Sequence, residues 1–196
     1  AGSVVSLGPR RFANDYWPDS HTGAITMTPD LSGRTALVTG SARRVGRELL
    51  LTLADHGADV VVHYNTSDVA AAATAEEARQ SGVKATVVQG DITDPDAIDA
   101  MFSDAKAALS TVDILVNAVG DFDARHWAKL DYADWQRVVE TNLYGTYLCS
   151  KRALEPMRTA GWGRIINFGF ADADRMHSHP VNFPYFVAKT GVLMFT

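Results

Sequence analysis

Cysteine, basic clusters and long apolar runs are scarce in this sequence, and each scarcity excludes a class of protein. Cys149 is the single cysteine, so no internal disulfide can form, which is typical of a reducing compartment. The net charge is -5 and no run of lysine and arginine occurs, which argues against nucleic acid as a partner. No apolar run approaches the roughly 18 residues of a membrane span, and residues 1–30 lack the apolar core of a signal peptide. We therefore expect a cytoplasmic protein that acts on small molecules, with no membrane partner.

The composition is that of a folded domain with a sizeable core. Of the 196 residues, 46% are hydrophobic and 21% are charged, a balance typical of globular proteins. Residues 1–30 mix glycine, proline, serine and isolated aromatics without a sustained period, so they are expected to form an N-terminal extension or arm. Residues 31–196 are expected to form one domain.

Short β-rich runs alternate with longer helical patterns from Leu31 onward. The runs are apolar enough to be buried on both faces of a sheet. This alternation predicts an α/β protein with a Rossmann-type, doubly wound parallel β-sheet flanked by helices. Strands are expected within residues 34–40, 58–65, 84–91, 112–120 and 163–169, and helices over 45–56, 68–81, 95–109 and 132–159 and from about 185.

The residues after the first strand are suited to hold a phosphate. In an open parallel sheet, ligands bind beyond the carboxyl ends of the strands. The first strand is followed by "TGSARRVGRE", in which Gly40 permits a tight turn and Gly46 opens a helix. The free N–H groups at such a helix start can face a pyrophosphate.

The residues after the second strand indicate which nucleotide is preferred. The segment "HYNTSD" lacks the acid that usually holds an unmodified ribose, and its neutral side chains can only form uncharged hydrogen bonds. Arg43 and Arg44 in the preceding loop can pair with a ribose 2'-phosphate, which an acid would repel. This combination favours NADP(H) over NAD(H).

Tyr185 and Lys189 share one face of the last predicted helix, because they are four residues apart in "YFVAK". A phenol has an unperturbed pKa of about 10, and a neighbouring ammonium lowers that pKa by favouring the phenolate. The pair is therefore a candidate for acid–base chemistry.

Five motifs occur in one order along the chain: "TGSARRVG", "GDI", "NAVG", "TNLYGTY" and "YFVAK". With these motifs, residues 31–196 resemble the short-chain dehydrogenase/reductase family. The resemblance implies an NADP-binding Rossmann domain. The cofactor-binding residues that it implies, together with those of the two loops above, are Gly40, Ser41, Arg43, Arg44, Val45, Gly46, Tyr64, Asn65, Thr66, Ser67, Asp91, Ile92, Asn117, Ala118, Val119 and Gly120.

The same resemblance implies the catalytic roles. Asn142 would hold a water in a proton relay that leads to Lys189. Lys189 would bind the nicotinamide ribose and lower the pKa of Tyr185, and Tyr185 would exchange the proton as hydride moves between nicotinamide and substrate. The arginine pair and "HYNTS" are similar to the pteridine reductases of the family, which again implies NADP(H).

The sequence departs from the family pattern at several positions. Arg44 stands where the family usually has a further glycine, and Asn-Ala-Val-Gly replaces Asn-Asn-Ala-Gly. Counting back from Tyr185 puts Asp172 at the position of the usual catalytic serine, whereas counting forward from the fifth strand puts Phe170 there. We favour Asp172, with Asp174 as a substitute if the loop is displaced.

An aspartate at this position changes the chemistry of the site. An ionised carboxylate only accepts hydrogen bonds and repels a developing oxyanion. Asp172 therefore suits a substrate with N–H donors, such as a pterin, or a site buried enough to keep the acid protonated. His177 and His179 lack further ligands at a sensible spacing, so no metal site is expected.

We therefore expect an NADPH-dependent oxidoreductase that reduces a carbonyl or a pterin-like C=N bond. The alternative is a non-catalytic cofactor-sensing or assembly protein on the same fold. Family members usually have about 250 residues, so we expect that the C-terminal part is missing from the domain or supplied by a second polypeptide. The resemblance also implies a homodimer or homotetramer.

Overall fold

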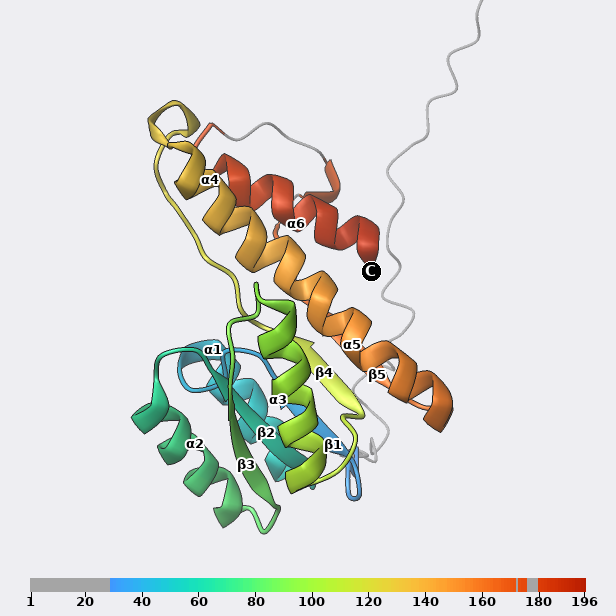
Figure 1. Cartoon of the computed structure of the whole chain (residues 1–196). Helices are drawn as coiled ribbons and strands as arrows, with labels where there is room; N and C mark the ends of the chain where they lie inside the picture. Colours follow the sequence, from blue (N-terminus) through green and yellow to red (C-terminus); the bar gives the residue numbers. More distant parts are fainter. Residues whose placement is uncertain (1–28, 172, 176–179) are drawn as a thin grey trace, which may run out of the picture.

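A five-stranded parallel sheet forms the centre of the molecule (Figure 1). The computed structural model describes residues 29–171, 173–175 and 180–196. Of the arm predicted for residues 1–30, only the last two residues lie within these ranges. The elements, in chain order, are β1 (Thr35–Val38), α1 (Arg44–Asp55), β2 (Asp59–Tyr64), α2 (Asp68–Gln80), β3 (Ala85–Gln89), α3 (Pro95–Ala108), β4 (Ile114–Asn117), α4 (Tyr132–Val139), α5 (Gly145–Ala160), β5 (Arg164–Asn167) and α6 (Phe183–Phe195).

The strand order is β3-β2-β1-β4-β5, and every neighbouring pair is parallel. From β1, the chain first adds β2 and β3 on one side. It then crosses back and adds β4 and β5 on the other side. This reversal between β1 and β4 is the switch point at which such sheets bind ligands. The predicted doubly wound α/β fold is confirmed.

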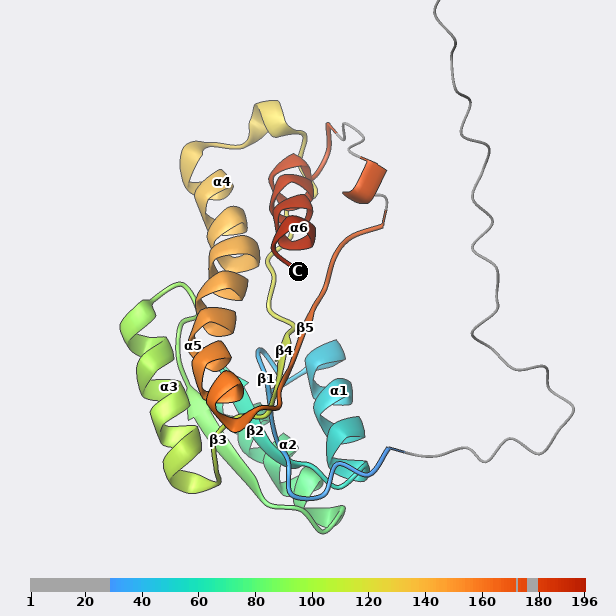
Figure 2. The same cartoon turned by 90° about the vertical axis from the view of Figure 1, so that its right-hand side faces the viewer.

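Alternate residues of each strand supply two separate cores. Val38 of β1 and Val62 of β2 face α1 and α2, whereas their chain neighbours Leu37 and Val61 face α3 and α5. All four residues are fully buried. Because successive side chains of a strand point to opposite faces, a strand covered on both sides must be apolar throughout. Figure 2 shows the two helix pairs on opposite sides of the sheet.

Short polar signals set the starts and ends of several helices. The Asp94 carboxylate accepts from the Asp96 N–H at 2.9 Å, and Pro95 begins α3. Asp131 and Asp134 form a reciprocal capping box at the start of α4. The end of α5 is set by Gly161, which adopts the left-handed conformation with φ of 68°.

The long helix predicted over residues 132–159 is not uniform. A π-helical turn, Glu140–Tyr144, joins α4 to α5 without a break in the chain direction. The turn contains Asn142, one of the predicted catalytic residues. Helix α6 lies against α4 and this turn, above the carboxyl end of the sheet (Figure 1). It begins at Phe183, slightly earlier than the predicted start near Tyr185.

Within the described residues, no helix is both long enough and apolar enough to cross a membrane.

Candidate active site and cofactor cleft

A cleft of about 480 Å³ opens at the carboxyl ends of β1, β2 and β3. Most of its wall comes from the loops that follow these strands. The predicted cofactor-binding residues that line it are Gly40, Arg43, Tyr64, Asn65, Thr66, Ser67, Asp91, Ile92 and Val119. The structure thus brings together residues that are separated by up to about two fifths of the chain.

One wall of the cleft was missed by the sequence reasoning. It comes from α4 and the π turn, through Gln136, Arg137, Glu140 and Thr141. Thr141 begins the motif "TNLYGTY", whereas the other three residues belong to no motif and lie within two helical turns before Asn142. Their position on a predicted helix that contains this motif was the one signal that could have indicated them.

The glycine loop after β1 fits a pyrophosphate cradle. Gly40 has φ of +69°, and a Cβ at this position would lie 2.8 Å from Cγ2 of Val119. A Cβ at Gly46 would lie 2.7 Å from the carbonyl oxygen of Gly40. The loop is therefore packed closely against both the first turn of α1 and the segment after β4, as a tight strand–turn–helix phosphate site requires.

The first turn of α1 presents positive charge and unprotected amides. Arg43 is extended at the N-cap and provides no side-chain cap, and the first turn contains no acid. Uncapped N–H groups and the positive end of the helix dipole favour an anion. The side chains of Arg43 and Arg44 are both exposed, but only Arg43 lines the cleft.

Arg44 adopts a backbone conformation that favours glycine. Its φ is 53°, which is in the left-handed region where a Cβ crowds the following carbonyl. This explains why a glycine is usual at this position of the family pattern. In this chain an arginine occupies the same strained geometry, at a cost of about 1 to 2 kcal/mol.

Asp91 connects the ends of β2 and β3 at the floor of the cleft. Its carboxylate accepts from the Thr93 N–H at 2.9 Å and from the Thr93 hydroxyl at 2.8 Å, and Nδ2 of Asn65 donates to it at 3.4 Å. These hydrogen bonds lower the pKa of Asp91, with those from Thr93 contributing most. Asp91 is therefore ionised at neutral pH.

Several other predicted cofactor residues lie behind the cleft rather than on its surface. Asn117 is buried and donates from Nδ2 to the Ser150 hydroxyl at 3.0 Å and to Oδ1 of Asn167 at 2.9 Å. The Thr39 hydroxyl accepts from the Ala118 N–H at 2.9 Å. These bonds hold the ends of β1, β4 and β5 together. The remaining residues of this group that do not line the cleft are Ser41, Arg44, Val45, Gly46 and Gly120.

Asn142 is fully buried in the π turn. Its Nδ2 donates to the carbonyl oxygens of Asp121 at 2.7 Å and Val138 at 2.9 Å. Its Oδ1 is buried without a hydrogen-bond partner among the described residues. Buried polar atoms are seldom unsatisfied, so this oxygen is an unusual acceptor at the centre of the helical rod.

Tyr185 lies at the start of α6 between two aromatic rings. Phe122 and Phe170 meet it edge-on, each with a centroid distance of 5.4 Å. The buried Lys189 places Nζ 5.5 Å from the centroid of the Tyr185 ring. The predicted pair is therefore present on one helix face, one turn apart.

The expected effect of Lys189 on Tyr185 is not seen in this arrangement. Burial raises the pKa of Tyr185, and burial lowers the pKa of Lys189. The expectation that Lys189 lowers the pKa of Tyr185 is thus wrong for the structure as it stands. The ammonium lies near the ring, where its effect on the phenol oxygen is weaker than the loss of solvation.

Of the three candidates for the position of the usual serine, the structure describes Phe170 and Asp174. Asp172 lies outside the described residues, as do His177 and His179. Asp174 is exposed in a short 3-10 turn, Ala173–Arg175. Phe170, the alternative from forward counting, packs against Tyr185 as described above. The residue of this loop that contacts the Tyr185 ring is therefore an aromatic one, Phe170.

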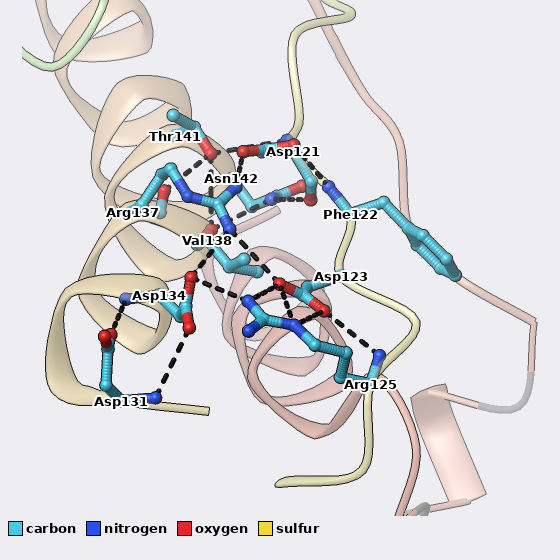
Figure 3. Close-up of polar contacts among 10 residues, drawn as sticks. All are labelled: Asp121, Phe122, Asp123, Arg125, Asp131, Asp134, Arg137, Val138, Thr141 and Asn142. Carbon is cyan, nitrogen blue, oxygen red and sulfur yellow. Dashed lines mark hydrogen bonds and ion pairs between the residues drawn. The ribbon is translucent and has the colours of Figure 1, made fainter. Parts of the chain in front are cut away.

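A network of ion pairs holds the segment after β4 against α4 (Figure 3). Arg125 donates to the Asp123 carboxylate at 2.5 Å and pairs with Asp134 at 2.7 Å. Arg137 pairs with Asp121 and also contacts Asp123, at 3.3 Å. The hydrogen bonds from Arg125 lower the pKa of Asp123 to about 2. No motif indicated this network.

The same segment holds the start of α6. The Trp127 N–H donates to the Pro180 carbonyl at 2.9 Å, and the Asn182 N–H donates to the Arg125 carbonyl at 3.2 Å. Asn182 is the N-cap of α6, three residues before Tyr185. The ion pairs thus connect the cofactor cleft, through α4 and this segment, to the position of Tyr185.

Comparison with known proteins shows to which family this chain belongs. Residues 34–196 match the model of the family described as short chain dehydrogenase. A short-chain type dehydrogenase/reductase of Picea abies is 35% identical over 145 residues, and a 3-oxoacyl-[acyl-carrier-protein] reductase of Synechocystis is 35% identical over 166 residues. These alignments cover 70% and 85% of this chain, and 54% and 66% of the relatives.

A solved structure shows the same arrangement of elements. A protein of Agrobacterium tumefaciens assigned as a gluconate dehydrogenase superposes with a TM-score of 0.79 and is 37% identical, over 85% of this chain and 65% of that one. This chain thus spans between about half and two thirds of the length of these three proteins. None of them supports a second polypeptide as the source of the remainder. The chain belongs to the short-chain dehydrogenase/reductase family.

Proposed function

We propose that this protein is an NADPH-dependent oxidoreductase that reduces a carbonyl or a pterin-like C=N bond, with Tyr185 as the proton donor. One observation carries the proposal. The segment Val119–Phe122 runs continuously from the wall of the cleft to the ring of Tyr185. A dinucleotide held at the glycine loop would therefore extend along this segment toward the phenol.

The chain's own residues supply binding and proton transfer. A bound nicotinamide cofactor supplies the hydride. The Tyr185 phenol donates a proton to the oxygen or nitrogen that becomes negative as hydride arrives at the substrate carbon. Lys189 is one turn away on the same helix, where it would bind the nicotinamide ribose.

The preference for the phosphorylated cofactor rests on charge. Arg43 lines the cleft beside the ends of β1 and β2, where the ribose of a nucleotide on the glycine loop would lie. The residues directly after β2 carry no acid, because Asn65, Thr66 and Ser67 precede Asp68. A 2'-phosphate would therefore meet a guanidinium and neutral donors, which favours NADPH.

The surroundings of Tyr185 favour a flat or apolar substrate. Phe122 is 56% exposed and Phe170 is 38% exposed, although both pack against the Tyr185 ring. Exposed aromatic edges beside a proton donor offer an apolar contact surface. The relatives named above include a 3-oxoacyl reductase and a gluconate dehydrogenase, so carbonyl substrates belong in the test beside the pterins.

The first experiment is a titration of the purified protein with NADPH and, in parallel, with NADH, followed by cofactor fluorescence. We expect tighter binding of NADPH. A panel of 3-oxoacyl thioesters, ketones, sugar acids and reduced or oxidised pterins then identifies the substrate by NADPH oxidation.

Tyr185→Phe is the matched variant for catalysis. It removes the hydroxyl and leaves the ring, so the contacts with Phe122 and Phe170 remain. We expect NADPH binding to be unchanged and turnover to fall by a factor of about 10² to 10⁴. Retained turnover would refute the role of Tyr185. Cofactor binding without turnover on the whole panel by the unmodified protein would favour the cofactor-sensing alternative.

We further propose that the protein forms a homodimer or homotetramer through α5 and α6. Large apolar side chains are exposed along both helices. They include Tyr144 directly before α5, Leu154 within α5, and Val187 and Met194 on α6. Exposed large apolar side chains of this kind are often buried in an interface between subunits. Analytical ultracentrifugation tests this proposal, and a monomer at micromolar concentration would refute it.

A further inference from the structure

His63, a residue of β2, holds the glycine loop from below. The residue is 1% exposed, and Nδ1 of its ring accepts from the Gly40 N–H at 2.9 Å. On the other side of the ring, Nε2 lies 3.0 Å from the Gly90 carbonyl oxygen. An amide N–H can only donate and a carbonyl can only accept. The ring must therefore be neutral, with its proton on Nε2.

The backbone of His63 completes the attachment. Its N–H donates to the Ser41 hydroxyl at 3.0 Å, and its carbonyl accepts from the Ser41 N–H at 3.0 Å. Ser41, a predicted cofactor-binding residue, is fully buried by these contacts. One residue of β2 thus fastens two consecutive residues of the loop and, through Gly90, the end of β3.

The loop cannot move at Gly40 without moving its neighbours. As described above, a Cβ at Gly40 would meet Val119, and a Cβ at Gly46 would meet the Gly40 carbonyl oxygen. The backbone at Gly40 and at Gly46 is therefore packed so closely against its neighbours that no side chain would fit. A displacement of Gly40 would therefore alter both the start of α1 and one wall of the cleft.

We propose that His63 is a positioning residue that keeps the glycine loop in its cofactor-binding shape only while the imidazole is neutral, so that acid weakens cofactor binding. This inference rests on the proposed function. Protonation would place an Nδ1–H against the Gly40 N–H at hydrogen-bond distance, where two donors face each other. It would also place a charge in a buried site, and the loop must open to relieve both effects.

The charges around the ring define the pH range. Burial is the main influence and lowers the pKa of His63, while the Gly90 hydrogen bond and the carboxylate of Asp91 oppose it. Asp91 stays ionised, since its own pKa is lowered. The other titratable side chains that line the same cleft are Arg43, Tyr64, Arg137 and Glu140. The transition is therefore expected below the ordinary histidine pKa of about 6.5.

The test measures the dissociation constants of NAD⁺ and NADP⁺ by calorimetry between about pH 5 and about pH 8. Both oxidised cofactors are used because NAD⁺ lacks the 2'-phosphate, which itself titrates in this range. For the unmodified protein, we expect the affinity for both cofactors to fall by about tenfold for each pH unit below the pKa of the ring.

His63→Asn is the informative variant. The asparagine Oδ1 can accept from the Gly40 N–H in place of Nδ1, but it does not titrate. We expect this variant to bind NAD⁺ with an affinity that changes little with pH. His56→Asn is the matched control, because His56 is the C-cap of α1, at the end opposite the loop. It should show the pH dependence of the unmodified protein.

A second measurement does not depend on the variant or on the cofactor. Nitrogen-15 NMR reports the protonation of the His63 ring, and hydrogen exchange reports the Gly40 amide. We expect the amide to lose protection in the same pH range in which the ring gains its second proton.

The two proposals fail in different ways. Absence of binding of either cofactor at about pH 8 would refute the proposed function. Equal pH dependence in the unmodified protein and in His63→Asn, or a Gly40 amide that stays protected while the ring is protonated, would refute the role of His63.

Discussion

Gly120 packs so closely on Asn142 that a Cβ at Gly120 would overlap the asparagine Oδ1. That oxygen is the buried acceptor of the π turn. The backbone after β4 and the side chain at the centre of the candidate site therefore have no free space between them.

We expect Gly120→Ala to displace Asn142 and to destabilise the protein by about 1 to 3 kcal/mol, as overpacking does. Gly191→Ala is the control: its Cβ would meet only the flexible end of Leu143, at 3.1 Å, and alanine favours the helix. Thermal unfolding of both variants measures the difference. Equal stability of the two variants would show that Asn142 can move without cost.

Arg44→Gly should separate backbone strain from charge. Glycine relieves the left-handed conformation, so we expect the free energy of unfolding to rise by up to about 1 kcal/mol. Arg43, and not Arg44, lines the cleft, so the preference for NADPH over NADH should change little. Arg44→Ala also removes the charge but keeps the strain, so it should show no gain in stability. A gain in stability for Arg44→Ala would contradict the assignment of strain.

Asp123→Asn should make stability less dependent on acid. The pKa of Asp123 in the folded protein, about 2, is below the usual value for an aspartate. The ionised form therefore adds stability above about pH 4, and this contribution is lost as the pH falls toward about 2. We expect the variant to be less stable than the unmodified protein at neutral pH, and the difference to shrink in acid.

Chemical denaturation at several pH values measures this effect. Asp104→Asn is the matched control, because it removes an exposed carboxylate of α3 that takes no part in these ion pairs. A pH-independent difference for Asp123→Asn would mean that the ion pairs with Arg125 and Arg137 do not stabilise the fold.

The thiol of Cys149 should not react with alkylating reagents in the folded protein. It is fully buried against α3 and the sheet, and burial raises the pKa of its thiol to about 12. The reactive species is the thiolate, so iodoacetamide should label the protein only after unfolding. Mass spectrometry with and without denaturant measures the labelling. Rapid labelling without denaturant would show that α5 separates from the sheet under native conditions.

The sheet could be predicted from the sequence because its residues carry a local signal. The run Val60–Val62 is apolar at every position, as burial on both faces demands, and the helices between the strands have clear polar starts. The loops after the strands followed from the topology, since parallel strands place their carboxyl ends at one edge of the sheet.

The parts that could not be predicted depend on contacts between distant residues. Asp123 and Arg137 are in different segments, and neither belongs to a motif, so only the folded chain shows that they pair. The pKa of Tyr185 followed burial rather than its helical neighbour Lys189, because desolvation depends on the whole surrounding structure. The register of the loop before α6 was ambiguous for the same reason, and the ring of Phe170 lies at Tyr185.

The π turn has a geometric consequence for the whole helical rod of α4 and α5. An α-helix advances by about 100° per residue, and a π turn accommodates one residue more than an α turn. Deleting one residue from Glu140–Tyr144 would restore a uniform α-helix and rotate α5 by about 100° relative to α4. Cys149 would then turn away from the sheet while Arg137 still faced the cleft. The extra residue thus sets the rotation of α5 relative to α4. With this rotation, α4 faces the nucleotide cleft and α5 faces the core.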